Sequence, residues 1–144
     1  MNKAYETAKI PFRATSGSAG YDICSPVNFE LRQGDEIVIP TALRCSIQPG
    51  WFMMIVPRSG LGFRFYTRLA NTCGIVDSDY YYAENQGHIH IKLRRETNRE
   101  NDRRVMSVNA GDAIAQAIFI PYGITEDDEA DGVRTGGFGS TDKK

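Results

Sequence analysis

The chain has 144 residues, a formal net charge of −1 and 41% hydrophobic residues. This length fits one domain with a sizeable core of its own. The nearly balanced charge excludes a chain-wide basic surface for nucleic acid, and no apolar run is long enough to span a membrane. We therefore expect a globular protein that binds neither nucleic acid nor membrane, and that meets any acidic substrate with local groups.

The N-terminal residues and the cysteines bear on the cellular compartment. Residues 1–6 lack the apolar stretch of a signal peptide, which favours a cytoplasmic location. The three cysteines, Cys24, Cys45 and Cys73, are odd in number and show no C-x-x-C spacing. They predict reduced thiols rather than a zinc knuckle or a disulfide framework.

Short apolar runs separated by glycine and proline turns predict an all-β protein. In chain order, strands are expected over residues 36–39, 51–56, 88–93 and 113–120. A short helix is expected from Ser59, as its cap, to about Tyr66. Strands at this spacing indicate a jelly-roll β-barrel or sandwich with one short helix.

Two segments are predicted to be mobile surface. Residues 94–104 interleave both charge signs, which favours a solvated loop over a nucleic-acid patch. Residues 125–132 are acidic and poor in apolar side chains, as in a linker, and a glycine-rich tail follows. We therefore expect a core over residues 1–123 and, in the same domain, a flexible linker and lid over residues 124–144.

Three segments carry groups suited to a phosphorylated nucleoside. In the tail, residues 134–141, arginine, serine and threonine side chains and glycine N–H groups suit phosphate, and Phe138 could stack on a base. Residues 57–61 stand at a predicted strand-to-helix corner, where N–H groups suit phosphate. Asn71 can donate and accept at once, as reading a base edge requires. Each segment alone is also compatible with an ordinary turn or tail.

Two pairs of side chains could hold a metal. Asp77 and Asp79, two residues apart in a predicted strand, would point to one face, where carboxylates hold a metal or activate water. They are equally compatible with a polar turn. His88 and His90 share the face opposite Ile89. No third ligand follows from the sequence, so a two-histidine metal site and a polar surface pair both stay open.

The order of these segments resembles the five motifs of the trimeric dUTPase family. The motifs read AGYD at 19–22, PRSGL at 57–61, GIVDSDY at 74–80, GDAIAQ at 111–116 and GGFGST at 136–141. The resemblance covers residues 8–141, nearly the whole chain. It implies a homotrimeric jelly roll that hydrolyses dUTP to dUMP and diphosphate, which limits uracil incorporation into DNA and supplies dUMP for thymidylate synthesis.

The resemblance also implies a role for each motif residue, in sites that combine phosphate motifs, base pocket and tail from three different chains. Asp77 matches the base that deprotonates water attacking the α-phosphorus, and Asp22 matches the residue that reaches Mg²⁺ through water. The residues matching substrate contacts are Arg58, Ser59, Gly60 and Gln116 for phosphate, Asn71, Gly74 and Ile75 for uracil, Tyr80 for deoxyribose, Phe138 with Gly139 over the base, and Arg134, Ser140 and Thr141 for the outer phosphates.

Three features depart from the family pattern. Val133 occupies the position where many relatives carry the tail arginine, so Arg134 stands one residue nearer the glycines. Residues 81–86 lengthen the hairpin after Tyr80 and could alter the rim of the base pocket. Ala113 replaces a larger, often basic residue of the fourth motif, so one contact is expected to be absent.

Two other functions remain compatible with the fold. A deoxycytidine triphosphate deaminase shares it, but would need a glutamate base beside C4 and would not be expected to carry the GGFGST tail. A non-catalytic jelly roll that senses nucleotides or binds protein would not need Asp77.

Overall fold

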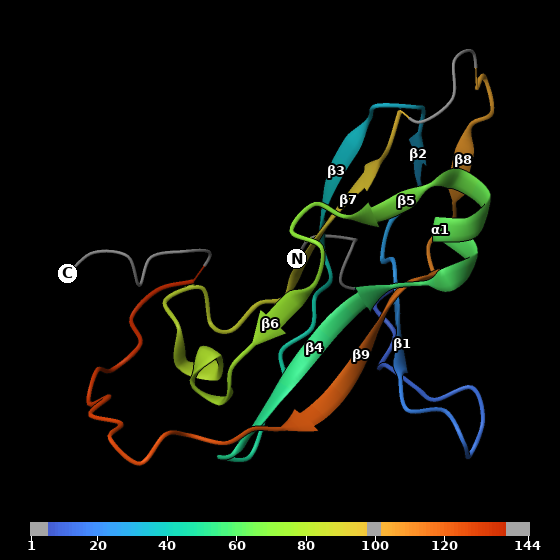
Figure 1. Ribbon diagram of the computed structural model, residues 1–144. Helices are drawn as coiled ribbons and strands as arrows, with labels where there is room; N and C mark the ends of the chain where they lie inside the picture. The colour runs from blue at the N-terminus through green and yellow to red at the C-terminus, as the bar shows by residue number, and fades with distance from the viewer. Residues whose placement is uncertain (1–5, 98–101, 138–144) are drawn as a thin grey trace.

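The computed structural model describes residues 6–97 and 102–137. Within them the chain is built mainly of strands, with one short α-helix and one 3-10 helix, as Figure 1 shows. The elements are, in chain order, β1 (Tyr21–Cys24), β2 (Phe29–Leu31), β3 (Glu36–Pro40), β4 (Trp51–Pro57), α1 (Ser59–Phe65), β5 (Thr67–Leu69), β6 (Gly74–Val76), η2 (Ser78–Tyr82), β7 (His90–Arg95), β8 (Met106–Val108) and β9 (Ala113–Pro121). The all-β prediction is confirmed.

The strands form three antiparallel sheets, with strand orders β1-β9-β4-β6, β2-β8 and β3-β7-β5. The longest pairing joins β4 to β9, from Trp51 opposite Pro121 to Pro57 opposite Ala115. Strands distant in sequence are therefore neighbours in the sheets, which is typical of a jelly roll. The predicted jelly-roll fold is confirmed.

Alternation along the strands places one face of each sheet in the core. Ile89, Ile91 and Leu93 are all buried, as their spacing predicts, whereas Lys92 and Arg94 of β7 are exposed. β7 lies between β3 and β5, so its apolar face packs in the middle of that sheet. Because each buried aliphatic side chain contributes about 1.5–3 kcal/mol, this face holds β3 and β5 on the core.

The helix begins as predicted, but Ser59 is not its cap. Arg58 occupies the capping position with extended backbone and no side-chain capping bond. The Arg58 amide donates to the Ile114 carbonyl at 3.4 Å, so the β4–β9 pairing continues through Arg58. This pairing holds the backbone of Arg58 extended and makes Ser59 the first helical residue.

The prediction that residues 94–104 form a solvated loop is wrong for its first part, because β7 extends through Arg95. Residues 102–104 contain neither helix nor strand, and Arg103 and Arg104 are exposed, as expected of such a loop. Arg95 is the final residue of β7, and none of its surface is exposed. Its guanidinium donates to the Leu31 carbonyl at 3.0 Å, to the Arg104 carbonyl at 2.5 Å and to Asp102 at 3.0 Å. A charge this deeply buried needs such partners, so Arg95 ties residues 102–104 to the sheet.

Replacing Asp102 by asparagine is expected to lower the Tm at pH 7 more than Arg104→Gln does, because it leaves Arg95 without its carboxylate. Hydrogen bonds from Arg104, and then Arg95, hold the pKa of Asp102 well below its usual range. Its stabilisation is therefore complete above the unfolded pKa of about 3.9 and is lost as the pH falls below that value. Thermal unfolding between pH 7 and pH 3 should show the Tm gap to wild type narrowing below about pH 4, because the stabilisation is lost completely only as the pH falls through the folded pKa; a constant gap would contradict this role.

No helix among the described residues is long and apolar enough to cross a membrane.

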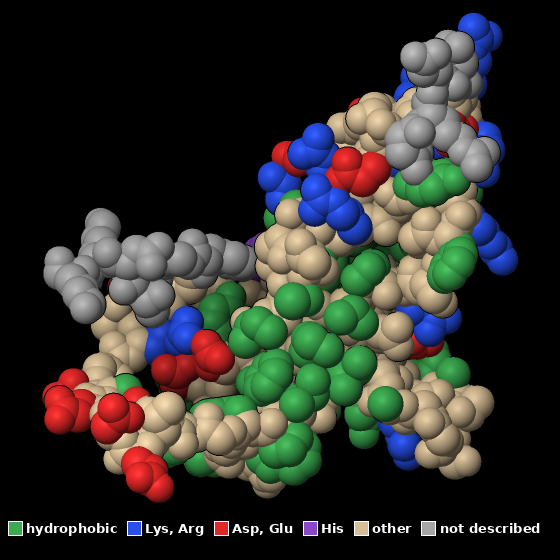
Figure 2. Space-filling model, in the orientation of Figure 1, with side chains coloured by type: hydrophobic (Ala, Val, Ile, Leu, Met, Phe, Trp, Pro, Cys, Tyr) green, Lys and Arg blue, Asp and Glu red, His purple; other side chains and the backbone are tan. Residues whose placement is uncertain are grey.

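Beyond β9, residues 122–137 contain neither helix nor strand and run back toward η2 (Figure 1). Their acidic side chains gather at one edge of the molecule, and hydrophobic side chains gather over β4 and β6 (Figure 2). Cys24, Cys45 and Cys73 are free thiols, as predicted.

Candidate functional site

A cavity beside β6 gathers most of the residues predicted to read the base and sugar. We call this space, about 230 Å³ in volume, the hairpin cavity. The predicted residues that line it are Asn71, Gly74, Ile75, Tyr80 and Arg134. The sequence motifs assign no contact to four further lining residues: Ile55, Val76, Ile89 and His90. Of these four, Ile55 could have been found only from strand pairing, because Gly74 lies directly opposite it on β4.

Asp77 and Asp79 converge, but not as neighbours on a strand face. β6 ends at Val76, Asp77 has extended backbone, and Asp79 lies within η2. The strand prediction is wrong because a turn, in which the Tyr80 amide donates to the Asp77 carbonyl at 3.2 Å, ends the sheet there. The two carboxylates are brought together by Arg134, which donates to Asp79 at 2.7 Å and also forms an ion pair with Asp77.

The described part of the tail lies against η2 of its own chain. The Glu84 amide donates to the Thr135 carbonyl at 3.0 Å. A Cβ added at Gly137 would lie 2.8 Å from Cε2 of Tyr80, so only glycine fits this close approach. Val133, which stands where many relatives carry the tail arginine, is exposed. Arg134 beside it contacts the carboxylates of Asp77 and Asp79. The remaining predicted tail contacts, Phe138, Gly139, Ser140 and Thr141, lie outside the described residues.

A second set of predicted residues gathers where β1, β9 and the end of β4 meet; we call it the β1–β9 group. Arg58 donates to Asp22 at 2.5 Å, and Asp22 is buried. Asp22 lies directly opposite Gln116 in the β1–β9 pairing, so their side chains share a face. The group therefore presents a guanidinium, an amide and a carboxylate, of which the first two can donate to phosphate oxygens.

Small residues leave room around this group. A Cβ at Gly20 would lie 2.4 Å from Oε1 of Gln116, so glycine lets the Gln116 side chain extend over the start of β1. Ser59 and Gly60 follow Arg58 at the start of α1 and are exposed, with no atom within 4 Å of a Cβ built on Gly60. The backbone after Arg58 is thus open to a bound anion.

The hairpin cavity lies beside β6 and the β1–β9 group lies at β1, and these two strands are on opposite edges of the four-stranded sheet (Figure 1). Val76 is opposite Met53 on β4, so Asp77 stands level with Phe52, whereas Arg58 follows the last residue of the strand. Six residues of extended chain separate these positions by roughly 20 Å. Within one chain, Asp77 and Arg58 are therefore not brought together.

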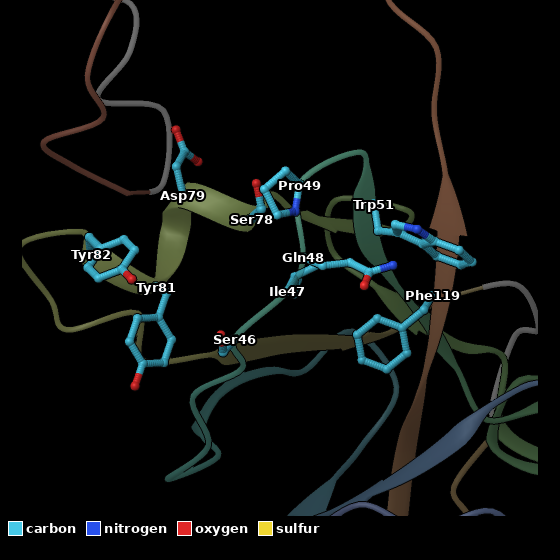
Figure 3. A pocket seen from close by; sticks show the side chains of 10 residues that line it. All are labelled: Ser46, Ile47, Gln48, Pro49, Trp51, Ser78, Asp79, Tyr81, Tyr82 and Phe119. Atoms are coloured by element: carbon cyan, nitrogen blue, oxygen red, sulfur yellow. The ribbon is translucent and has the colours of Figure 1, made fainter.

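A wider hollow of about 860 Å³ lies on the other side of η2, and Figure 3 shows its lining side chains. Tyr81 and Tyr82, from the hairpin extension, lie on one side, and Trp51 and Phe119 lie on the other (Figure 3). Asp79 is the one charged residue of its lining, which includes no lysine or arginine. Within one chain, a triphosphate would find no countercharge in this lining.

The histidines do not form a metal site of their own. The two rings lie 4.2 Å apart, and Nε2 of His88 accepts from the Ala42 amide at 3.1 Å. Burial, and then the neighbouring His90, lower the pKa of His88, which suits this acceptor role. In residues 6–97 and 102–137 no three histidine, cysteine or acidic side chains are grouped to hold a metal ion.

The β1–β9 group fits an ion that is bound mainly by substrate. Mg²⁺ is held in proteins through one or two carboxylates together with substrate phosphates and water. Asp22 supplies one carboxylate next to Arg58, which is itself suited to phosphate. The donor set therefore fits Mg²⁺ carried by a polyphosphate rather than a metal held by protein ligands alone.

A jelly roll that combines a cavity holding the Asn71 amide with an arginine-bearing group suited to phosphate has the groups that a nucleotide-binding β protein needs. The family model described as dUTPase matches residues 6–142. The chain belongs to the dUTPase family.

Named relatives and solved structures agree with this assignment. The deoxyuridine 5′-triphosphate nucleotidohydrolase of Escherichia coli K12 is 37% identical, over 94% of this chain and 88% of the relative. That of Lactococcus lactis is 34% identical, over 92% and 87%. The Streptococcus mutans dUTPase superposes with a TM-score of 0.71 and 27% identity, over 84% of this chain and 91% of that one. A variant dUTPase from phage phi11 of S. aureus, whose structure concerns a structural Mg(II) ion, shares the fold at 21% identity and a TM-score of 0.72, over 93% and 97%.

Proposed function

We propose that the protein hydrolyses dUTP to dUMP and diphosphate in the cytoplasm, and thereby limits uracil incorporation into DNA and supplies dUMP for thymidylate synthesis. The observation that carries the proposal is the grouping of the motif residues, in a member of the dUTPase family, into a cavity of nucleobase size and a phosphate-suited group. The relatives from E. coli and L. lactis bear the name of this activity.

The hairpin cavity would bind the base and sugar. Asn71 and the backbone of Gly74 and Ile75 would pair with the uracil edge. Cytosine presents a donor where uracil presents an acceptor, so it would leave a buried group unpaired, which costs about 1–3 kcal/mol. The Tyr80 ring would pack on deoxyribose and leave no room for a 2′-hydroxyl.

The β1–β9 group would bind the triphosphate. Arg58, Ser59, the Gly60 amide and Gln116 would donate to its oxygens, and charge-assisted bonds from arginine are the strongest of these. Asp22 would reach Mg²⁺ through water. Bound there, Mg²⁺ would neutralise charge on the phosphates.

Asp77 would act as the general base. Its carboxylate is half exposed, at 50%, and can therefore contact water. It would accept a proton from a water molecule whose oxygen attacks the α-phosphorus, while the bond to the bridging oxygen of the diphosphate breaks. The protein's hydrogen-bond donors that contact the phosphates would stabilise the negative charge that develops on the leaving diphosphate.

We propose that the active site is shared between chains of a homotrimer. Two observations support this. Asp77 and Arg58 are roughly 20 Å apart along β4, too far to act on one triphosphate from a single chain. Figure 2 shows hydrophobic side chains gathered over β4 and β6, and such patches commonly mark interfaces. Ile75 of β6 is itself 55% exposed.

The tail would close the site from a neighbouring chain. Its linker and lid, residues 124–144, would belong to the same domain as the core over residues 1–123. Phe138 and Gly139 would cover uracil, and Arg134, Ser140 and Thr141 would hold the outer phosphates. In the single chain Arg134 contacts Asp77 and Asp79 of its own chain, so closing a neighbouring site would require the tail to leave this contact.

A nucleotide panel tests the proposed function. Diphosphate release is measured with Mg²⁺ and dUTP, dCTP, dTTP or UTP, alongside an ammonia assay with dCTP. We expect kcat/KM for dUTP to exceed that for dCTP by about 100-fold, since one unpaired buried group can cost up to about 3 kcal/mol. It should also exceed the values for dTTP and UTP, whose C5 methyl group and 2′-hydroxyl would not fit the cavity. Ammonia from dCTP would instead indicate a deaminase, and no turnover of any nucleotide would indicate a non-catalytic protein.

A further inference from the structure

The hydroxyl of Tyr80 is held by a residue of the hairpin extension. Nδ2 of Asn85 donates to this hydroxyl at 2.7 Å, and the hydroxyl donates to the His88 carbonyl at 2.9 Å. Nδ2 of Asn85 also lies 3.3 Å from the same carbonyl. A tyrosine hydroxyl has one proton to donate and lone pairs to accept with, so both of its functions are engaged and the far end of the ring is fixed.

Asn85 is itself held firmly by the turn around it. Its Oδ1 accepts from the Gly87 amide at 3.2 Å, and its carbonyl accepts from the His88 amide at 3.2 Å. Gly87 has a φ of +68°, and a Cβ there would lie 2.9 Å from the Tyr80 carbonyl. Only glycine lets the turn close this tightly, so residues 85–88 form a brace behind Tyr80.

The braced ring lies between this turn and the hairpin cavity. Tyr80 lines the cavity, and Gly137 of the tail approaches the edge of its ring. The hydroxyl is tied on one side while the ring forms a wall of the cavity on the other. The Tyr80 ring can exclude an additional hydroxyl of a ligand only if the ring keeps its position. The turn at residues 85–88 therefore determines how strictly a ligand with that hydroxyl is excluded.

We propose that Asn85 is a positioning residue for sugar discrimination: by fixing the hydroxyl of Tyr80, it holds the ring where it excludes the 2′-hydroxyl of ribonucleotides. The inference rests on the proposed function, in which Tyr80 packs on deoxyribose. Asn85 acts through Tyr80 and touches no reacting atom. Residues 81–86, which depart from the family pattern, thereby contribute to substrate selection.

The test compares kcat/KM for dUTP and UTP in Asn85→Ala, in Asn85→Asp and in wild type. Asp keeps the oxygen that accepts from Gly87 but replaces the donor to Tyr80 by an acceptor, so the hydroxyl would have to turn from the His88 carbonyl to the carboxylate. This substitution changes the position of the ring while it preserves the bond that closes the turn. In both variants we expect the dUTP-to-UTP ratio to fall roughly five- to tenfold, the equivalent of one hydrogen bond, mainly through faster UTP turnover. Glu84→Ala, which changes an exposed neighbour, should keep the wild-type ratio.

A double-mutant cycle with Tyr80→Phe adds a readout that a general loss of stability would not produce. If Asn85 acts through the hydroxyl, adding Asn85→Ala to Tyr80→Phe should lower the ratio no further. An unchanged ratio in a folded Asn85→Asp enzyme, or additive effects in the cycle, would overturn the inference while leaving dUTP hydrolysis intact. A wild-type protein inactive on dUTP would instead reject the proposed function.

Discussion

Replacing Asp77 by asparagine is expected to lower kcat for dUTP by about 10²–10⁴-fold, the usual contribution of a positioned general base. Asparagine has nearly the same shape and can still contact Arg134, but its amide cannot take a proton from water. Diphosphate release at saturating dUTP measures kcat, and calorimetry with a non-hydrolysable dUTP analogue measures binding. We expect the analogue to bind within a few-fold of its wild-type affinity.

Asp79→Asn is a matched control for this substitution. Asp79 and Asp77 are 53% and 50% exposed, and both contact Arg134. Because Asp79 is not assigned to proton transfer, its substitution should reduce kcat less than tenfold, or by less than 1.4 kcal/mol. Equal losses in the two variants would mean that the shared ion pair with Arg134 matters, and not the proton acceptor at position 77.

Deleting residues 133–144 should reduce kcat/KM for dUTP by about 100-fold or more. The deletion removes the Arg134 donor, worth about 1.5–3 kcal/mol to a charged partner, and Phe138, whose stacking on a base is worth about 1–3 kcal/mol. The core strands end at Pro121, so the protein should remain folded and keep its oligomeric state. Steady-state kinetics and size-exclusion chromatography with light scattering measure the two effects.

Two controls separate the tail motif from the mere presence of extra residues. Deletion of residues 142–144, beyond the last motif, should leave kcat/KM close to wild type. Val133→Ala changes an exposed side chain next to Arg134 and should also have little effect, whereas Arg134→Ala should lose most of what the arginine contributes. Full activity of the protein lacking residues 133–144 would rule out the lid.

Local patterns predicted the elements well where a segment decides its own structure. The alternation of Ile89, Ile91 and Leu93 predicted the buried face of β7, because a strand presents successive side chains to opposite sides. The prediction for the cap of α1 was wrong because pairing with β9 extends through Arg58. Arg95 was predicted to be exposed from its charged neighbours, but partners from β2 and residues 102–104 stabilise it in the core.

The candidate site could be predicted in its members but not in its arrangement. The motifs assigned Asp22 to a metal and Arg58 and Gln116 to phosphate, and the structure brings these three residues together although they lie far apart in sequence. They did not reveal that Arg134 brings Asp77 and Asp79 together across a turn. Asn85 was overlooked, although an asparagine two residues before a glycine is a signal for a side-chain-closed turn of the kind observed.

The sequence by itself determined the residue types, the strand periodicity and the five ordered motifs, because these depend on local backbone preference and on the chemistry of single side chains. Only the tertiary structure decided which groups lie together. Strand pairing sets the roughly 20 Å between Asp77 and Arg58, and the turn at residues 85–88 sets the position of the Tyr80 ring. The strand pairing joins residues far apart in sequence, which no local pattern specifies. The turn has a local signal, but its contact with the Tyr80 hydroxyl follows only from the way the chain folds back there.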